Sequence, residues 1–261
     1  MIILGYISGI IMGIVLGLLG GGGSILTVPI ITYLFSIPPT LATSYSLFIV
    51  GISAAIGASS YVKKGLIEYK VGSYFAISAF FSIYLVRQVL LPIIPNIIDI
   101  FNLFILSKDN LVMLVFSIVM LGASISMIRG RKESDDTKKP VQIILLILQG
   151  LFVGSITGFV GAGGGFLIIP GLVFLAGLKM KRAVGTSLLV ISINSLFGFS
   201  SDLINGTIVD WNLLLKFTLV GIIGVFIGTF ISNKISNQKL KPLFGWFVLI
   251  AGTFIIFKET L

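Results

Sequence analysis

The sequence GLLGGGGSILTVP at residues 17–29 has a closely related counterpart in the second half of the chain. Residues 158–170 read GFVGAGGGFLIIP, 141 positions further on. Eight residues recur at this single offset: Gly9, Gly13, Gly17, Gly20, Gly22, Gly23, Leu26 and Pro29 return as Gly150, Gly154, Gly158, Gly161, Gly163, Gly164, Leu167 and Pro170. Later matches follow in the same order: Thr43-Ser44 recurs as Thr186-Ser187 after a two-residue loop difference, and Gly65-Leu66-Ile67 faces Gly206-Thr207-Ile208 at the first offset. Collinear matches at one offset indicate an internal duplication.

The composition is that of a membrane protein. Only 10% of the 261 residues are charged, 56% are hydrophobic, and the mean hydropathy is +1.14. A soluble domain carries about a quarter charged residues. Charged residues are absent from four long runs: 1–62, 111–128, 140–178 and 217–233. Because these runs are continuously apolar, without period-two alternation, they favour membrane-spanning helices over a β-barrel.

The apolar segments predict an all-α polytopic membrane protein, multi-pass in the cell membrane, with 8 to 10 transmembrane or half-spanning helices. The expected segments are 2–19, 24–36, 42–62, 71–94 and 111–128, then 141–158, 165–178, 184–204, 212–232 and 242–257. Segments 24–36 and 165–178 are short enough to be half-helices. Residues 1–19 have no basic leader and have an internal counterpart, so we expect them to form a mature helix. Five segments per half is an odd number, so the two halves are predicted to be inverted.

The charge pattern supports the inversion and fixes the domains. We expect a first transmembrane repeat at 1–128, a cytoplasmic linker at 129–139 and a second transmembrane repeat at 140–261. The linker holds five Lys/Arg residues, which are typical of the cytoplasmic side. In the second half the basic loops are 179–182 and 234–241, and their counterparts in the first half, 36–41 and 94–110, hold fewer basic residues. Conversely, Lys63-Lys64 in the first half corresponds to 203–207, which has no basic residue. This swap of sides places both termini outside.

The same residues exclude several function classes. A net charge of +9 could indicate nucleic-acid binding, but the basic residues lie in short loops between apolar runs, so no nucleic acid is expected. The chain has no Cys and no His, which excludes disulfides, metal sites built on these residues and histidine proton relays. Ser and Thr without His or a central carboxylate argue against an intramembrane enzyme. We expect no catalytic residues, no metal and no cofactor.

The glycine runs are the candidate binding site for a small anionic substrate. Consecutive glycines break a helix, and broken backbone is tolerated at membrane depth only where it is packed in protein or lines a polar cavity. The short helix after each run would aim its N-terminus at that cavity, and a helix N-terminus suits an anion without a lysine. The candidate substrate-binding residues are Gly20, Gly21, Gly22, Gly23, Ser24 (as N-cap), Thr43, Ser44, Gly161, Gly163, Gly164, Gly165, Thr186 and Ser187. A tight turn without a ligand remains the alternative.

The other polar residues of the spans are assigned simpler roles. Gly9, Gly13 and Gly17, like Gly150, Gly154 and Gly158, form stripes for close helix packing. Gln149, Ser155, Thr157, Ser192, Asn194 and Ser195 are expected to hydrogen-bond between helices. Arg87 is expected to snorkel to the membrane interface, and Asp202 is expected to be interfacial. With no central carboxylate, an anion leaving a negative-inside cell could move without a coupling ion.

At this point the sequence resembles a known family. The duplicated pattern of glycine run, apolar stretch and Pro, followed by Thr-Ser, is similar to the sulfite exporter TauE/SafE family of membrane transporters. Asp210-Trp211 after Gly206-Thr207-Ile208-Val209 resembles the same family, whereas the first half has Glu68-Tyr69 there. The resemblance implies export of sulfite, a sulfonate or thiosulfate. An anion channel, or a membrane protein without transport activity, stays open, as does assembly into a homo-oligomer.

Overall fold

The computed structural model describes residues 2–21, 23–100, 104–129, 142–161, 163–232 and 237–260, and these residues are almost entirely helical. In chain order the elements are α1 (Ile2–Leu19), α2 (Ser24–Phe35), α3 (Pro39–Lys63), α4 (Tyr69–Leu85), the π turn η1 (Val86–Leu90), α5 (Leu91–Ile93), β1 (Ile97–Ile100), β2 (Phe104–Ser107), α6 (Lys108–Ile128), α7 (Ile143–Val160), α8 (Gly165–Phe174), α9 (Met180–Ile204), α10 (Trp211–Ser232) and α11 (Asn237–Thr260).

Six of the described helices are long and apolar enough to cross a bilayer, counting α4, η1 and α5 as one. They are α3, α4–α5, α6, α7, α9 and α10. Most of them also expose large apolar side chains, such as Phe81 on α4 and Phe230 on α10, which a bilayer would cover. The prediction of an all-α polytopic membrane protein is confirmed.

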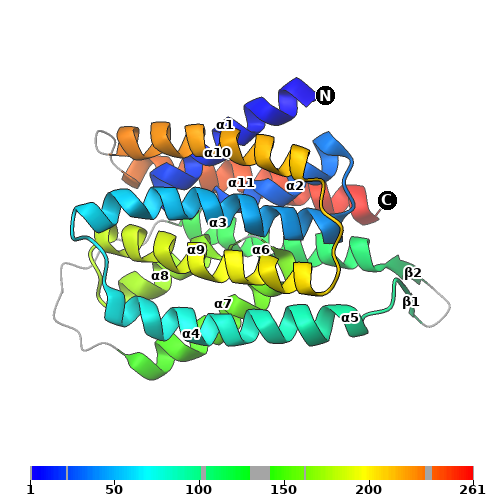
Figure 1. Cartoon of the computed structure of the whole chain (residues 1–261), viewed down its shortest axis with the longest axis horizontal. Helices are drawn as coiled ribbons and strands as arrows, with labels where there is room; N and C mark the ends of the chain where they lie inside the picture. Colours follow the sequence, from blue (N-terminus) through cyan, green and yellow to red (C-terminus); the bar gives the residue numbers. More distant parts are fainter. Residues whose placement is uncertain are drawn as a thin grey trace.

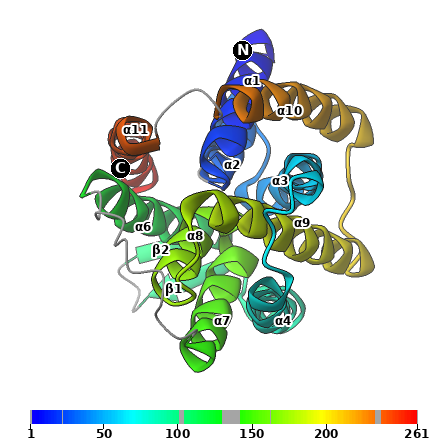
Figure 2. The ribbon, with the colours of Figure 1, turned by 90° about the vertical axis from the view of Figure 1, so that its left-hand side faces the viewer.

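Two helices form the centre of the bundle. In the apolar windows of α3 and α9, 72% of the residues are buried, against 39% for α4, α6, α7 and α10. Seen end-on, α1 lies beside α10, α4 beside α7, and α6 beside α11, with α2, α3, α8 and α9 between these pairs (Figure 2). The central position of α3 and α9 explains why their faces carry small and hydroxyl residues rather than a single apolar stripe.

The helix boundaries of the two halves can be compared at the offset of the sequence repeat. The offset of the sequence repeat carries the ends of α1, Ile2 and Leu19, onto the ends of α7, Ile143 and Val160. It carries the ends of α3 onto those of α9 in the same way. In Figure 1, α1 and α7 run in opposite directions, as do α3 and α9.

The two ends of the bundle are named by the helices that reach them. The start of α1 and the end of α11 lie at one end, which we call the outer end (Figure 1). The opposite end, where α3 finishes and α9 begins, is the inner end.

The glycine stripes pack where they were predicted to pack. A methyl group on Gly17 of α1 would lie 2.6 Å from the carbonyl oxygen of Val225 in α10. A methyl group on Gly154 of α7 would lie 2.7 Å from the Cα of Ala79 in α4. The missing side chains therefore let the backbones of the paired helices touch, which is how helices associate within a bilayer.

We expect the Gly154→Ala substitution to destabilise the protein by about 1–3 kcal/mol, because the new methyl group meets backbone that cannot turn aside. Gly122→Ala in α6 is the matched control. Nothing lies within 4 Å of that position, and alanine is the better helix former by roughly 0.5–1 kcal/mol. Melting temperatures in detergent would separate the two. Equal shifts would show that the stripe does not hold α7 against α4.

Some boundaries differ from the sequence expectations. The antiparallel hairpin of β1 and β2 between α5 and α6 was not predicted. α11 begins at Asn237, earlier than the predicted start at 242, and continues through Pro242. The short segments are short helices, α2 and α8, as expected. The linker expected at 129–139 lies outside the described residues except for Arg129.

Candidate functional site

Each glycine run ends one helix and starts the next because its backbone takes conformations that glycine adopts readily. Gly20 and Gly21 have φ angles of 67° and 149°, and Gly161, Gly163 and Gly164 have φ angles of 72°, 63° and 66°. The two ends are built alike. The N–H of Gly20 donates to the carbonyl of Leu16 (2.9 Å), and the N–H of Gly161 donates to that of Thr157 (2.8 Å). Gly22, which belongs to the candidate site, lies outside the described residues.

The two glycine runs meet in the middle of the bundle. A methyl group on Gly21 would lie 2.5 Å from the Cα of Gly165, and one on Gly165 would collide with Gly21 in return. Gly163 lies against Val50 and Ile191, which are close to the midpoints of α3 and α9. The N-termini of α2 and α8 therefore start from one shared, buried position at mid-depth.

The central helices contact the glycine runs through equivalent residues. A methyl group on Gly161 would lie 2.5 Å from the Cβ of Thr43, and one on Gly20 would lie 3.0 Å from the Cβ of Val184. The spacing from Thr43 to Val184 is the same as that from Gly20 to Gly161. Thr43 is thus equivalent to Val184, and the pairing of Thr43-Ser44 with Thr186-Ser187 is wrong. Both helix starts carry hydroxyl residues, so a two-residue shift still matches Thr-Ser with Thr-Ser.

Three of the predicted hydroxyl residues differ in what they contact. Ser24 is not the N-cap of α2, because Gly23 holds that position and the Ser24 hydroxyl donates to the carbonyl of Gly21 at 2.7 Å. The Thr186 hydroxyl accepts the N–H of Glu68 (3.0 Å), away from the glycine runs and toward the inner end. Ser187 does reach a glycine run, since its hydroxyl donates to the carbonyl of Gly20 at 2.8 Å.

The contact of Thr186 has an equivalent in the other half. The N–H of Asp210 donates to the phenol oxygen of Tyr45 at 2.6 Å, and the repeat offset carries Tyr45 onto Thr186. Each central helix therefore fixes the start of the helix after its repeat partner. These two contacts also support the equivalence of Glu68-Tyr69 and Asp210-Trp211.

Buried hydroxyl groups without a hydrogen-bond partner in the described part of the chain occur on the helices that contact the glycine runs, and one of them lies against Gly163. The side-chain oxygens of Thr27, Ser46 and Ser195 are buried and have no hydrogen-bond partner among the described residues. The Ser195 oxygen lies 3.3 Å from the position of a methyl group on Gly163. Helix-to-helix bonding was expected of Ser195 and is wrong for it, although Ser155 does bond to Ser82 (2.6 Å). Buried polar atoms without a partner in this position are the ones that a bound ligand or water would satisfy.

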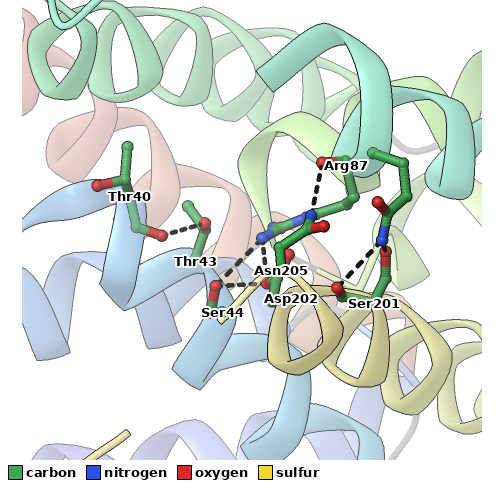
Figure 3. A network of polar contacts seen from close by, with 8 residues as sticks. Thr40, Thr43, Ser44, Arg87, Ser201, Asp202 and Asn205 are labelled. Atoms are coloured by element: carbon green, nitrogen blue, oxygen red, sulfur yellow. Dashed lines mark hydrogen bonds and ion pairs between the residues drawn. The ribbon is translucent and has the colours of Figure 1, made fainter. Parts of the chain in front are cut away.

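A second polar cluster lies at the outer end (Figure 3). Arg87 in η1 forms a buried ion pair with Asp202 in α9, with 2.6 Å between Nη1 and Oδ2. The Ser44 hydroxyl donates to the same carboxylate, and Arg87 Nη1 lies 3.3 Å from the Ser44 oxygen. Gln88 donates to the carbonyl (3.1 Å) and hydroxyl (2.7 Å) of Ser201. The cluster joins α3, α4–α5 and α9 at one end of the bundle.

The expectation that Arg87 snorkels to the membrane interface is wrong. Its side chain is only 2% exposed and pairs with Asp202, whose side chain is 8% exposed. The interfacial position expected of Asp202 stays a prediction. Pro92 lacks the N–H that an α-helix would use at this turn, and the helix widens into a π turn just before it. Arg87 lies in this turn and contacts α9 instead of the surface. The two residues are far apart in the sequence, so the pairing had no local signal; only the rarity of charge in the spans marked them.

The inner end has no equivalent of this cluster among the described residues. The repeat offset carries Tyr61 onto Asp202 and Ser44 onto Gly185. Tyr61 packs on Gly185, where a methyl group would lie 2.8 Å from the Tyr61 Cβ. The only ion pair that the described residues place near this end is the half-exposed Arg182–Glu68 pair.

Metal binding finds no support in the described part of the chain. Among those residues, no three His, Cys, Asp or Glu side chains come together in a way that could hold a metal ion.

The comparisons with known proteins agree with this architecture. The family described as "Sulfite exporter TauE/SafE" matches residues 5–256. A "Probable membrane transporter protein" of Xylella fastidiosa (strain 9a5c) is 28% identical and covers 97% of this chain and 94% of its own. Similar relatives occur in Bacillus subtilis (strain 168), at 27% identity over 95% of this chain and 97% of the relative, and in Haemophilus influenzae, at 24% over 98% of each. No solved structure matches the chain. Since the family covers nearly the whole sequence, this chain is a multi-pass membrane protein that belongs to the sulfite exporter TauE/SafE family.

Proposed function

We propose that this protein is a secondary transporter of a small anion, with its binding site at the meeting point of the two glycine runs. The observation that carries the proposal is the contact of Gly21 with Gly165 beside buried hydroxyl groups without partners among the described residues. Two inverted, broken helices that aim their N-termini at mid-depth are the usual architecture of a transporter site. The helix N-termini supply partial positive charge and N–H donors, which suit an anion.

The transported anion is proposed to be sulfite, a sulfonate or thiosulfate. This step rests on the family description, which names sulfite export, while the names of the relatives specify no substrate. Export would need no coupling ion, because an anion leaving a negative-inside cell gains about 2.3 kcal/mol per charge per 100 mV. The close approach of the two glycine backbones favours alternating access over a channel, since a channel requires a continuous path.

The inner end is proposed to be cytoplasmic. Lys63, Lys64, Lys179 and Arg182 lie at this end, and short cytoplasmic loops carry an excess of such residues. Because the chain has no cysteine, a single Lys64→Cys substitution would report which end faces out of a liposome through a membrane-impermeant thiol reagent.

We expect purified protein in liposomes to move sulfite, thiosulfate or sulfoacetate with saturable kinetics, driven by a potassium-diffusion potential alone. The measurement is the flux of each anion at clamped potential, with chloride and taurine for comparison and with the Lys64→Cys reporter to select the orientation. Flux of none of the anions would contradict transport. Flux that stops only when a proton ionophore is added at clamped potential would contradict uncoupled export, and non-saturating flux would indicate a channel.

A further inference from the structure

One edge of the buried guanidinium of Arg87 has no partner among the described residues. Arg87 is 3% exposed, and Arg87 and Asp202 are the charged residues that are buried in the described part of the chain. Nη1 is engaged by Asp202 and Ser44. Nε and Nη2 are both buried and have no hydrogen-bond partner within the same ranges. The unpaired atoms are therefore the two that form the other edge of the guanidinium.

This edge has the shape of an oxyanion site. The N–H groups of Nε and Nη2 point in parallel from a rigid plane and match two oxygens bound to one atom, as in a sulfonate, sulfite or carboxylate. Leaving charged donors buried and unpaired is costly, so such donors in a native structure call for a ligand or water. Lysine carries the same charge but cannot present two parallel donors.

The position of Arg87 lies next to the proposed path of the anion. Gly161 of the second glycine run contacts Thr43, and the next residue, Ser44, bonds to the Arg87–Asp202 pair (Figure 3). The sequence of contacts leads from the glycine runs toward the outer end. Thr43 and Ser44 therefore lie between the glycine runs and Arg87.

We propose that Arg87 is a second anion-binding residue, at the outer side of the glycine runs, which holds two oxygens of the substrate through Nε and Nη2. The proposal rests on anion transport as the function of the protein. Ser44 and Asp202 are positioning residues that fix the plane of the guanidinium. Asp202 also cancels the net charge of the site, so that the donors specify an oxyanion without trapping it, as a path for ions requires.

The proposal predicts a loss of oxyanion affinity in Arg87→Lys that chloride does not share. Thermal-shift titrations of the full chain in detergent would use sulfite, thiosulfate, sulfoacetate and chloride as probes. Loss of the paired donors should weaken oxyanion binding roughly 10- to 100-fold, because each hydrogen bond to a charged group contributes substantially. Chloride has one centre and no fork to match, so its affinity should stay unchanged. Arg182→Lys, in the half-exposed pair with Glu68, is the matched control and should bind all probes as the wild type does.

Ser44→Ala is the second variant, which keeps the guanidinium and removes one anchor of Nη1. We expect it to weaken oxyanion binding less than Arg87→Lys and in the same order of anions. If Arg87→Lys does not fold, Ser44→Ala decides, and wild-type affinity in it overturns the proposal. Wild-type affinity in a folded Arg87→Lys overturns it as well, as does equal weakening of chloride.

The liposome flux separates this proposal from the proposed function. If the wild-type protein transports oxyanions and Arg87→Lys has an unchanged KM, the role of Arg87 in binding is contradicted and the proposed transport function is not. If the wild-type protein binds oxyanions through Arg87 but transports none of them, the binding site is supported and the proposed transport is contradicted. An oxyanion affinity equal to that for chloride in the wild type would contradict the fork geometry itself.

Discussion

Alanine at Gly165 is expected to reduce anion flux to the level of protein-free liposomes. The added methyl group collides with the Cα of Gly21 and with Ile191, so the two glycine runs cannot keep their contact at mid-depth. Gly21→Ala places its methyl group in the same contact from the other side, 2.5 Å from the Cα of Gly165. The measurement is flux per monodisperse protein in liposomes, and either variant that folds is informative.

Gly206→Ala is the control for this effect. Gly206 also has a positive φ of 82°, but nothing lies within 4 Å of the position of its missing methyl group. This variant carries only the left-handed backbone strain, about 1–2 kcal/mol. We expect it to melt at a lower temperature and to transport normally. Wild-type flux in a folded Gly165→Ala would place the moving part of the protein away from the glycine runs.

The second large effect concerns the buried ion pair. We expect Asp202→Ala to lower the free energy of unfolding by about 3–5 kcal/mol, because it leaves the charge of Arg87 buried without its counter-ion. Replacing both partners, as in Arg87→Met with Asp202→Leu, should recover much of this loss, since neither charge then remains in the apolar surroundings. Unfolding in detergent of Arg87→Met, of Asp202→Leu and of the double variant gives the coupling energy of the pair.

The exposed pair at the inner end supplies the comparison. Glu68→Ala breaks the pair with Arg182, whose side chain is 47% exposed, and should cost no more than about 1 kcal/mol. Equal losses in Asp202→Ala and Glu68→Ala would mean that Arg87 finds another counter-charge or reaches water when Asp202 is removed.

The sequence was sufficient to predict the helices, because unbroken apolar runs and glycine breaks are local features of the chain. The predicted segment 2–19 is α1, and the predicted segment 212–232 is α10, which begins one residue earlier. The contact of the two glycine runs agrees with the shared cavity that the sequence predicted for them. The parts that failed depend on contacts between distant segments. Nothing near Arg87 indicates that Asp202 lies opposite it, and the partner of Ser24 depends on how the glycine backbone turns.

The equivalence of the central hydroxyl residues shows the same limit. Thr43-Ser44 and Thr186-Ser187 look alike in the sequence, yet helix register makes Thr43 equivalent to Val184. A two-residue shift turns a helix by more than half a turn, so residues matched in this way point in different directions. The contacts with Gly161 and Gly20, together with the matching ends of α3 and α9, reveal the correct register.

The difference between the two ends of the bundle determines which conformation the protein adopts without substrate. If the two ends open in turn during transport, opening the outer end separates Arg87 from Asp202, whereas opening the inner end separates Tyr61 from Gly185, a contact with no charge in it. The two states then differ in free energy, and each 1.4 kcal/mol of difference shifts their populations about tenfold. We therefore expect the unloaded protein to rest with its outer end shut, so that the binding site is reached first from the inner end.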